Sequence, residues 1–379
     1  MQNKYIKRAM ALCDEFVQWQ GKDGGINVEA CPYLAEKYQP LFRFMEVPFM
    51  ARALYRVYNI TNVKKYKASA DRYCLYYIDF VTGLYVDEGE KIAYKMGIAL
   101  ECIYLYANNN LSMYNKMIER AQPFIQCLEG LKTAAGCYFR CGYLPGTKGL
   151  ENVPDVGFSD DLNHVGRGIA RYHEMAGDLF TYKGILGLIN YYLTDIEEGT
   201  MHGIWHPGLG TWAIGPWPDT AFEHMDNTPA NAVGWVFSAY GVADFLLDAY
   251  EIIEDAGLKK KIANACIRSA RWCFENCQFD DGALGMTGRD DKWLGLTATA
   301  VMYYIKLKDM ELLSKKDDDD LKAGAVKAWD WLVCNTEPGN MPEAGYLKVT
   351  GNTKPVPGDN IAWLLAWTIE ALTLGEKLQ

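Results

Sequence analysis

The segment 157–183 gathers side chains that could carry out acid–base chemistry. Its first two helical turns hold Asp160, Asp161, Asn163, His164 and Arg167. Asp161 and His164 are three residues apart, so they share one face of a helix, whereas Asn163 points elsewhere. A carboxylic acid beside an imidazole can donate and accept protons during a reaction. The same aspartates also suit an ordinary helix start, because Asp is a preferred N-cap and acidic groups favour the helix dipole.

The catalytic interpretation requires the two aspartates to have different tasks. If Asp160 is the N-cap, Asp161 is available for another role in the first turn. Arg167 and Arg171 follow on later turns, where each can pair with a carboxylate of the protein or of a substrate. Whether this segment lines a pocket then depends on where the rest of the chain directs its other helix starts.

The chain contains a weak sixfold repeat. Each unit has an amphipathic helix, a loop with glycine and an aromatic residue, and a more apolar helix rich in Gly and Ala. The units are 6–58, 63–107, 112–177, 180–250, 258–307 and 320–374. We predict an all-α fold, an (α/α)6 toroid of six helical hairpins with short strands or turns in the loops at one end; an open solenoid is the alternative. No linker divides residues 1–379, so we predict a single domain.

In a toroid all inner helices begin at the same end, and their first turns and preceding loops line one cup. These starts are polar in this chain, and tryptophans lie in or just after the same loops, where their faces suit sugar rings. Capping of helices and filling of the loop layer are the structural alternatives. The residues that we predict to bind substrate are Asp160, Asn163, Arg167, Trp217, Asn231, Trp235, Arg289, Asp291, Trp293, Asp359 and Trp363.

Composition restricts the possible functions. The formal net charge of −10 and the lack of a basic cluster argue against a nucleic-acid partner. No apolar stretch is long enough to span a membrane, and the first residues lack the apolar run of a signal peptide, so we expect a cytoplasmic protein. The 11 cysteines form no CxxC pair, which favours free thiols. No zinc-type spacing, HExxH motif or P-loop occurs, so no metal or cofactor is expected.

Spaced motifs over most of the chain resemble the unsaturated glucuronyl and rhamnogalacturonyl hydrolases, glycoside hydrolase families 88 and 105. Asp161 is followed by the turn 176–178 and by Tyr182, at a spacing similar to the pattern of those families. Asp87 matches an aspartate that they place before the second inner helix. Gly234 with Trp235 is similar to their Gly-Trp element on the fourth inner helix.

The chain departs from this pattern at two places. Phe158 and Ser159 replace the tryptophan that often precedes the aspartate of the third inner helix. Asn231 and Ala232 stand near the position of an arginine that usually precedes the Gly-Trp element. These changes indicate either a different substrate or other chemistry on the same fold.

The resemblance implies hydration of the C4=C5 double bond of a terminal unsaturated uronic acid on an oligosaccharide. A carboxylic acid protonates C4, water adds at C5, and the resulting hemiketal opens and releases the sugar. In this chain Asp161 would be the acid/base group, Asp87 its partner, and His164 would orient substrate or water. Arg167 or Arg289 would bind the uronate carboxylate, and no metal or cofactor is required.

Three other functions remain open. A conventional glycosidase would use two carboxylates, such as Asp161 and Asp291. A polysaccharide lyase would use Asn163 and His164 with an arginine and a tyrosine. A toroid without catalytic activity would bind glycans or proteins.

Overall fold

The computed structural model describes most of the chain, and the descriptions below concern that part alone. The described residues are 3–27, 47–87, 93–132, 159–196, 203–213, 236–286, 288–289, 292–336, 347–348 and 361–378. They form two compact units, one of residues 78–272 and one of residues 1–77 with 273–379. The organisation of the chain as a single domain stays a prediction.

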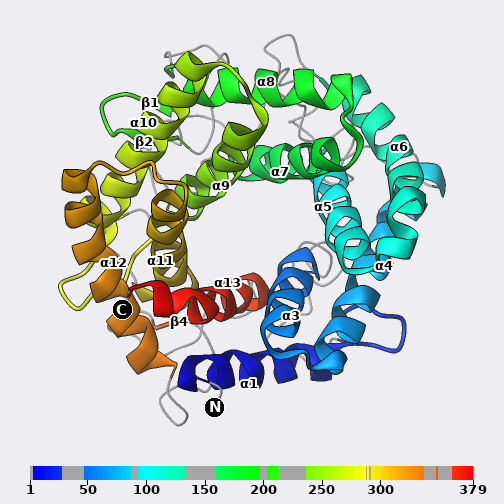
Figure 1. The fold of residues 1–379 in the computed structure, drawn as a ribbon, viewed down its shortest axis with the longest axis horizontal. Helices are drawn as coiled ribbons and strands as arrows, with labels where there is room; N and C mark the ends of the chain where they lie inside the picture. Colours follow the sequence, from blue (N-terminus) through cyan, green and yellow to red (C-terminus); the bar gives the residue numbers. More distant parts are fainter. Residues whose placement is uncertain are drawn as a thin grey trace, which may run out of the picture. The chain divides into compact units, whose positions relative to one another are not determined.

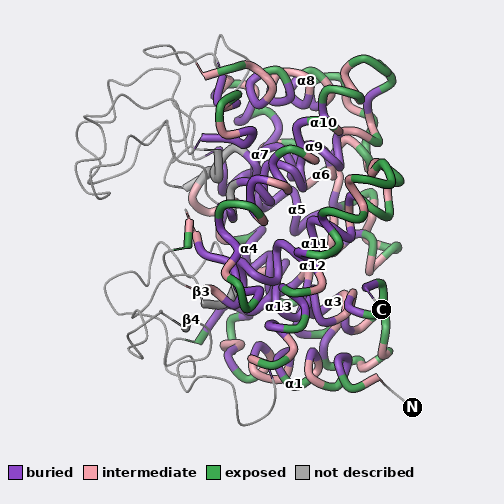
Figure 2. Tube along the Cα trace, turned by 90° about the vertical axis from the view of Figure 1, so that its left-hand side faces the viewer, coloured by how far each residue is buried: buried purple, intermediate pink, exposed green. Residues whose placement is uncertain are grey.

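The unit of residues 78–272 consists of helical hairpins. Its helices are the end of α4 (Lys64–Asp87), α5 (Ala93–Asn109), α6 (Tyr114–Gly130), α7 (Ser159–Ala176), α8 (Leu179–Leu193), α9 (Val236–Ile252) and α10 (Ala256–Trp272), with the 3-10 turn η2 (Leu111–Met113) before α6. Helices α5, α7 and α9 pack side by side as an inner layer, and α6, α8 and α10 each cover one of them (Figure 1). The inner helices are largely buried, whereas the connections between helices carry many exposed residues (Figure 2).

The other unit repeats this arrangement. Its helices are α1 (Lys4–Trp19), α3 (Val47–Thr61), the start of α4, the π-helical turn η4 (Cys273–Cys277), α11 (Leu294–Asp309), α12 (Lys315–Asn335), α13 (Ile361–Leu374) and the 3-10 turn η5 (Gly375–Leu378). Helix α13 packs between α3 and α11, while α12 covers α11 and α1 lies against α3 and α13 (Figure 1).

The burial of each helix follows its sequence pattern. Helix α1 buries residues at helical spacing, including Tyr5, Ala9, Leu12 and Phe16, and leaves the opposite face polar. Helix α11 instead buries every residue from Leu294 to Ile305, because neighbouring helices cover it on more than one side. These two helices follow the predicted alternation of amphipathic and apolar helices, whereas the inner helix α7 is amphipathic and the covering helix α8 is largely apolar.

Short strands occur in the loops, as predicted. Strand β1 (Trp205–His206) pairs with β2 (Thr211–Trp212), and β3 (Lys292–Trp293) pairs with β4 (Leu347–Lys348), both antiparallel. The indole N–H of Trp212 donates to the Tyr192 carbonyl at 2.8 Å and anchors the first hairpin on α8.

The same tight turn occurs twice in the unit of residues 1–77 and 273–379. Its sequences are QGKDGGI from Gln20 and QFDDGAL from Gln278. In both turns the glutamine Nε2 donates to the carbonyl of a glycine with φ of +99°, at 3.2 Å for Gly24 and 3.2 Å for Gly282. Each glutamine also donates to a carbonyl of the following covering helix, in α4 and α12 respectively, so each turn fastens one hairpin to the next.

The predicted end of α4 is wrong. The loop of the unit 63–107 was expected over residues 81–90, yet α4 continues through Gly83 to Asp87. Tyr77, Ile78 and Val81 are buried at helical spacing, and this packing outweighs the low helix propensity of one glycine. Asp87 is therefore the last residue of α4, and α5 begins only at Ala93.

Candidate active site

The first turn of α7 contains both aspartates of the predicted site. The helix begins at Ser159, one residue before the predicted N-cap, so Asp160 and Asp161 both lie inside it. The side chains of residues 159–162 lie outside the described part, and only their place on the helix can be used. Asp160 is seven residues before Arg167 and shares its face, whereas Asp161 is seven residues before Gly168.

Glycines allow α7 to approach both of its inner neighbours. A Cβ added at Gly168 would lie 2.1 Å from the Gly97 carbonyl oxygen of α5. On the other side, a Cβ at Gly166 would lie 2.6 Å from the Phe245 ring of α9. The glycines on either side of Arg167 thus serve packing, because any larger residue would push the helices apart.

Asn163 and His164 are buried in these same contacts. Their relative exposures are 2% and 4%. Asn163 lies against Gly241 of α9, where an added Cβ would meet its amide at 2.4 Å, and the His164 backbone lies against Gly97. Asn163 thus contacts α9 and the His164 backbone contacts α5, while the direction of the His164 side chain stays a prediction.

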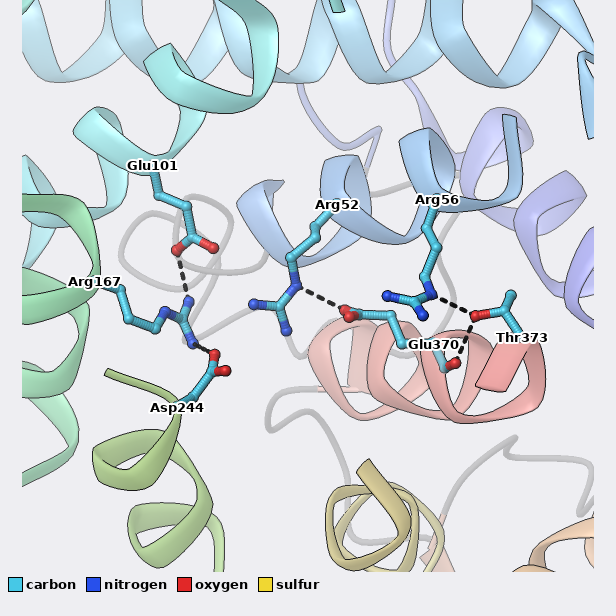
Figure 3. A network of polar contacts seen from close by, with 7 residues as sticks. All are labelled: Arg52, Arg56, Glu101, Arg167, Asp244, Glu370 and Thr373. Carbon is cyan, nitrogen blue, oxygen red and sulfur yellow. Dashed lines mark hydrogen bonds and ion pairs between the residues drawn. The ribbon is translucent and has the colours of Figure 1, made fainter. Parts of the chain in front are cut away.

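Arg167 connects three helices through two ion pairs (Figure 3). Its Nη2 lies 2.6 Å from Glu101 Oε2 of α5, and its Nη1 lies 3.4 Å from Asp244 Oδ2 of α9. The three side chains are 2%, 6% and 9% exposed. Of the two partners foreseen for Arg167, a protein carboxylate or a substrate carboxylate, the structure therefore shows the protein carboxylate.

A second ion-pair layer lies one turn further along α7. Arg171 Nη2 lies 2.7 Å from Asp248 of α9 and its Nη1 lies 2.8 Å from Glu174, while its guanidinium stands 5.1 Å from the Tyr104 ring centre on α5. Burial alone would lower the pKa of Arg171, but the carboxylates of Asp248 and Glu174 outweigh burial and raise the pKa above its ordinary value. Burial raises the pKa of the Tyr104 hydroxyl.

The inner helices of the other unit carry polar pairs as well. Arg52 Nε of α3 lies 2.8 Å from Glu370 Oε1 of α13, and Arg56 Nε lies 2.5 Å from Thr373 Oγ1 (Figure 3). Trp293 lies at the start of α11 on strand β3, and its buried indole N–H finds no acceptor among the described residues. Arg289 is exposed and forms no ion pair within the described part of this unit. Trp363 lies in α13, but its side chain is outside the description.

Several predicted site residues lie outside the described ranges altogether. They are Trp217, Asn231, Trp235, Asp291 and Asp359. Their proximity to Asp161 stays a prediction, and so does the pairing of Asp161 with Asp87, whose side chain is likewise undescribed.

Sequence reasoning missed Glu101 and Asp244. Glu101 is the one acid in GIALECIYLY and Asp244 is one of two in GVADFLLDAY, and an acid in a buried helix must have a partner. That signal was present in the sequence. The identity of the partner could not be predicted, because Arg167 lies 66 residues from Glu101 and 77 from Asp244.

The turn after α7 is the motif of residues 176–178 that resembles the pattern of families 88 and 105. Gly177 adopts φ of +63°, and Asp178 caps α8 by accepting from the Phe180 and Thr181 amides at 2.7 and 3.1 Å. This part of the pattern thus has a structural role, because it reverses the chain between two helices.

Other groups of chemical interest are few in the described residues. They contain no cluster of three or more metal-ligating side chains. The described cysteines are free thiols, and burial raises the pKa of Cys13 and Cys273. Among the helices described, none is both long and apolar enough to cross a membrane.

Comparisons with known proteins find relatives by structure alone. No protein-family profile and no curated protein matches the sequence. A sugar epimerase from a ruminal bacterium is 12% identical with a TM-score of 0.65, covering 98% of each chain. An α-1,6-mannanase from Salegentibacter is 10% identical with a TM-score of 0.67, covering 99% of this chain and 100% of its own. A possible GH105 member from Salmonella enterica is 13% identical with a TM-score of 0.66, covering 100% and 96%.

These similarities show the fold of this chain. It is the all-α (α/α)6 toroid fold of six helical hairpins, as the sequence predicted. A possible GH105 member is among the structures that share the fold, and so is a family 88 glycosyl hydrolase from Bacteroides vulgatus. The resemblance inferred from the sequence motifs is therefore confirmed for the fold.

Proposed function

We propose that this protein is a carbohydrate-active hydrolase whose catalytic groups lie at the N-terminal end of α7. The observation that carries the proposal is the pair of adjacent aspartates in the first turn of this inner helix. The solved structures that share the fold are described as sugar epimerases and glycoside hydrolases, which supports a sugar substrate. The substrate is an oligosaccharide, and the cytoplasmic location stays a prediction.

Asp161 is the proposed acid/base group, and His164 one turn later orients substrate or water. Glycoside hydrolysis needs a carboxylic acid to protonate the leaving oxygen and a second carboxylate to act on the opposite side of the bond. Hydration of an unsaturated uronide needs the same acid to protonate carbon. Both reactions therefore depend on Asp161 and differ in the group that acts together with it.

The first candidate substrate is an oligosaccharide that ends in an unsaturated uronic acid. The GH105 and family 88 structures with the same fold support it. Asp87 is then the partner of Asp161, and a cation must bind the uronate carboxylate. Because Arg167 already pairs with Glu101 and Asp244, Arg289 is the better candidate for this cation.

The second candidate substrate is an uncharged glycan. It is supported by the α-1,6-mannanase, of which an inactive variant has two adjacent aspartates replaced by asparagine. Asp160 and Asp161 are adjacent in the same way, and they are the carboxylates that this reaction would use. Both α7 arginines are paired with carboxylates of the protein, which favours a substrate without charge over a uronate.

Two more pairings stay predictions. A glycosidase could combine Asp161 with Asp291, and a lyase would use Asn163 and His164. The lyase is the weaker of the two, because the Asn163 side chain is buried against Gly241 of α9.

Absorbance at the wavelength of the C4=C5 uronate distinguishes these reactions. Purified protein is incubated with unsaturated disaccharides, with intact uronate polymers and with neutral α-glycans, and released reducing ends are measured in parallel. Falling absorbance on the disaccharides identifies uronide hydration, rising absorbance on the polymers identifies a lyase, and reducing ends from neutral glycans identify a glycosidase. No turnover on any of them contradicts the proposal.

A further inference from the structure

The ion-pair layers of α7 lie in a fixed order behind the aspartates. His164 is one turn from Asp160 and Asp161, Arg167 is about two turns away, and Arg171 follows one turn after Arg167. Each arginine layer contains a carboxylate from α9, Asp244 or Asp248. The Arg167 layer alone has ion pairs to both inner neighbours of α7.

Stability alone does not account for this buried layer. Removing two carboxylates and a guanidinium from water costs more than their attraction often returns, and well-packed apolar residues are commonly as stable. The stability of the fold therefore does not explain why three charged side chains that are only 2–9% exposed lie together between these helices. Fixing one arrangement of helices is the best-attested role of such groups.

The packing around Arg167 indicates why α7 needs a polar link to its neighbouring helices. Helices are normally held in register by side-chain ridges that fit into grooves. Gly97 and Gly168 let the α5 and α7 backbones meet without interlocking side chains, so this contact sets the distance between the helices and supplies no polar link between them. Arg167 supplies a directional link there, since its two terminal nitrogens reach carboxylates on opposite sides of α7.

We infer that Glu101, Arg167 and Asp244 are positioning residues, which hold the first two turns of α7 in register between α5 and α9. They thereby fix where Asp160, Asp161 and His164 stand relative to bound substrate. This inference rests on the proposed function for its catalytic consequence, though the structural consequence can be tested without it. A displacement of about 1 Å of a catalytic group can lower a rate by about 100-fold.

The test replaces the buried charges of each layer by apolar residues, and in the control only the partly exposed Glu174 loses its ion pair. The variant Glu101→Leu/Arg167→Met/Asp244→Leu removes the Arg167 layer, which is the upper layer because it lies nearer to the aspartates. The matched control Arg171→Met/Asp248→Leu removes the buried pair of the layer one turn further from the aspartates. We expect both variants to fold with Tm values within about 5 °C of the wild type. The upper-layer variant should lose about 100-fold in kcat with KM nearly unchanged, whereas the control keeps its kcat.

Hydrogen exchange gives a second readout that needs no substrate. The amides of residues 159–166 should exchange faster in the upper-layer variant than in the wild type, and the control should leave them unchanged. Equal losses of kcat and equal exchange in both variants would show a general structural role and overturn the inference. If the wild-type protein hydrolyses no glycan, the proposed function fails, and hydrogen exchange alone decides the inference.

Discussion

Tyr304 shows how one buried hydroxyl can tune a charged neighbour. Its hydroxyl donates to Asp318 Oδ1 at 2.6 Å and accepts from Lys308 Nζ at 3.1 Å. The hydrogen bond from Tyr304 lowers the pKa of Asp318 despite partial burial of that carboxyl, and Lys308 lowers it further. Burial and Asp318 together raise the pKa of Tyr304.

Replacing Tyr304 by Phe should therefore have a pH-dependent cost. Because the folded-state pKa of Asp318 lies below its unfolded value, the stabilisation is complete above the unfolded pKa and is lost as pH falls through the folded pKa. We expect Tyr304→Phe to lower the unfolding free energy by at most about 1 kcal/mol at pH 7, since Asp318 is partly exposed. The loss should shrink below about pH 4.

Urea unfolding from pH 2 to pH 7 measures this effect. In a double-mutant cycle, Asp318→Asn should cost less in the Tyr304→Phe protein than in the wild type. A loss that is the same at every pH would show that Tyr304 acts by packing alone.

At the scale of elements, glycine contacts set the distance between the inner helices. Gly97 and Gly168 meet backbone to backbone, so a methyl group at Gly168 has no free space. We expect Gly168→Ala to lower the unfolding free energy by about 1–3 kcal/mol, the usual cost of overpacking, even though Ala favours helix.

Gly130 provides the control, because it is likewise a helical glycine, the last residue of α6, but has no atom within 4 Å of an added Cβ. Gly130→Ala should be neutral or stabilising by up to about 1 kcal/mol. The Tm values of Gly168→Ala and Gly130→Ala, measured by thermal unfolding, test this expectation. Equal Tm values would contradict a close contact between α5 and α7.

The elements also show which features a sequence reveals. The repeat of a helix, a loop with glycine and a second helix predicted the six hairpins, although α7 and α8 do not follow the predicted alternation of amphipathic and apolar helices. The end of α4 was missed, since a Gly-aromatic pair usually signals a turn and only packing around Val81 extends the helix. The ion pairs of Arg167 were not predictable either, because their partners come from helices that only the fold brings together.

At the scale of the whole molecule, the chain forms two compact units of unusual connectivity. One unit uses both ends of the chain, residues 1–77 and 273–379, and helix α4 runs across the boundary between Tyr77 and Ile78. Unfolding one unit alone would break α4 in its middle, where Tyr77 and Ile78 are fully buried. We therefore expect a single cooperative transition.

Differential scanning calorimetry tests this expectation. A calorimetric enthalpy equal to the van't Hoff enthalpy is the predicted result. Two resolved transitions would show that the units unfold separately and would contradict the prediction of a single domain.

Asp161 is the residue that we propose to carry the chemistry of a carbohydrate hydrolase. The most direct measurement is kcat of Asp161→Asn and of Asp178→Asn on the glycan that the wild-type protein cleaves, with Tm measured for each. Asp178 caps α8 through its Oδ1, an oxygen that asparagine also has, so Asp178→Asn should keep both its stability and its turnover. Asp161→Asn should keep a Tm near that of the wild type and lose nearly all turnover. Full turnover in Asp161→Asn would contradict the account.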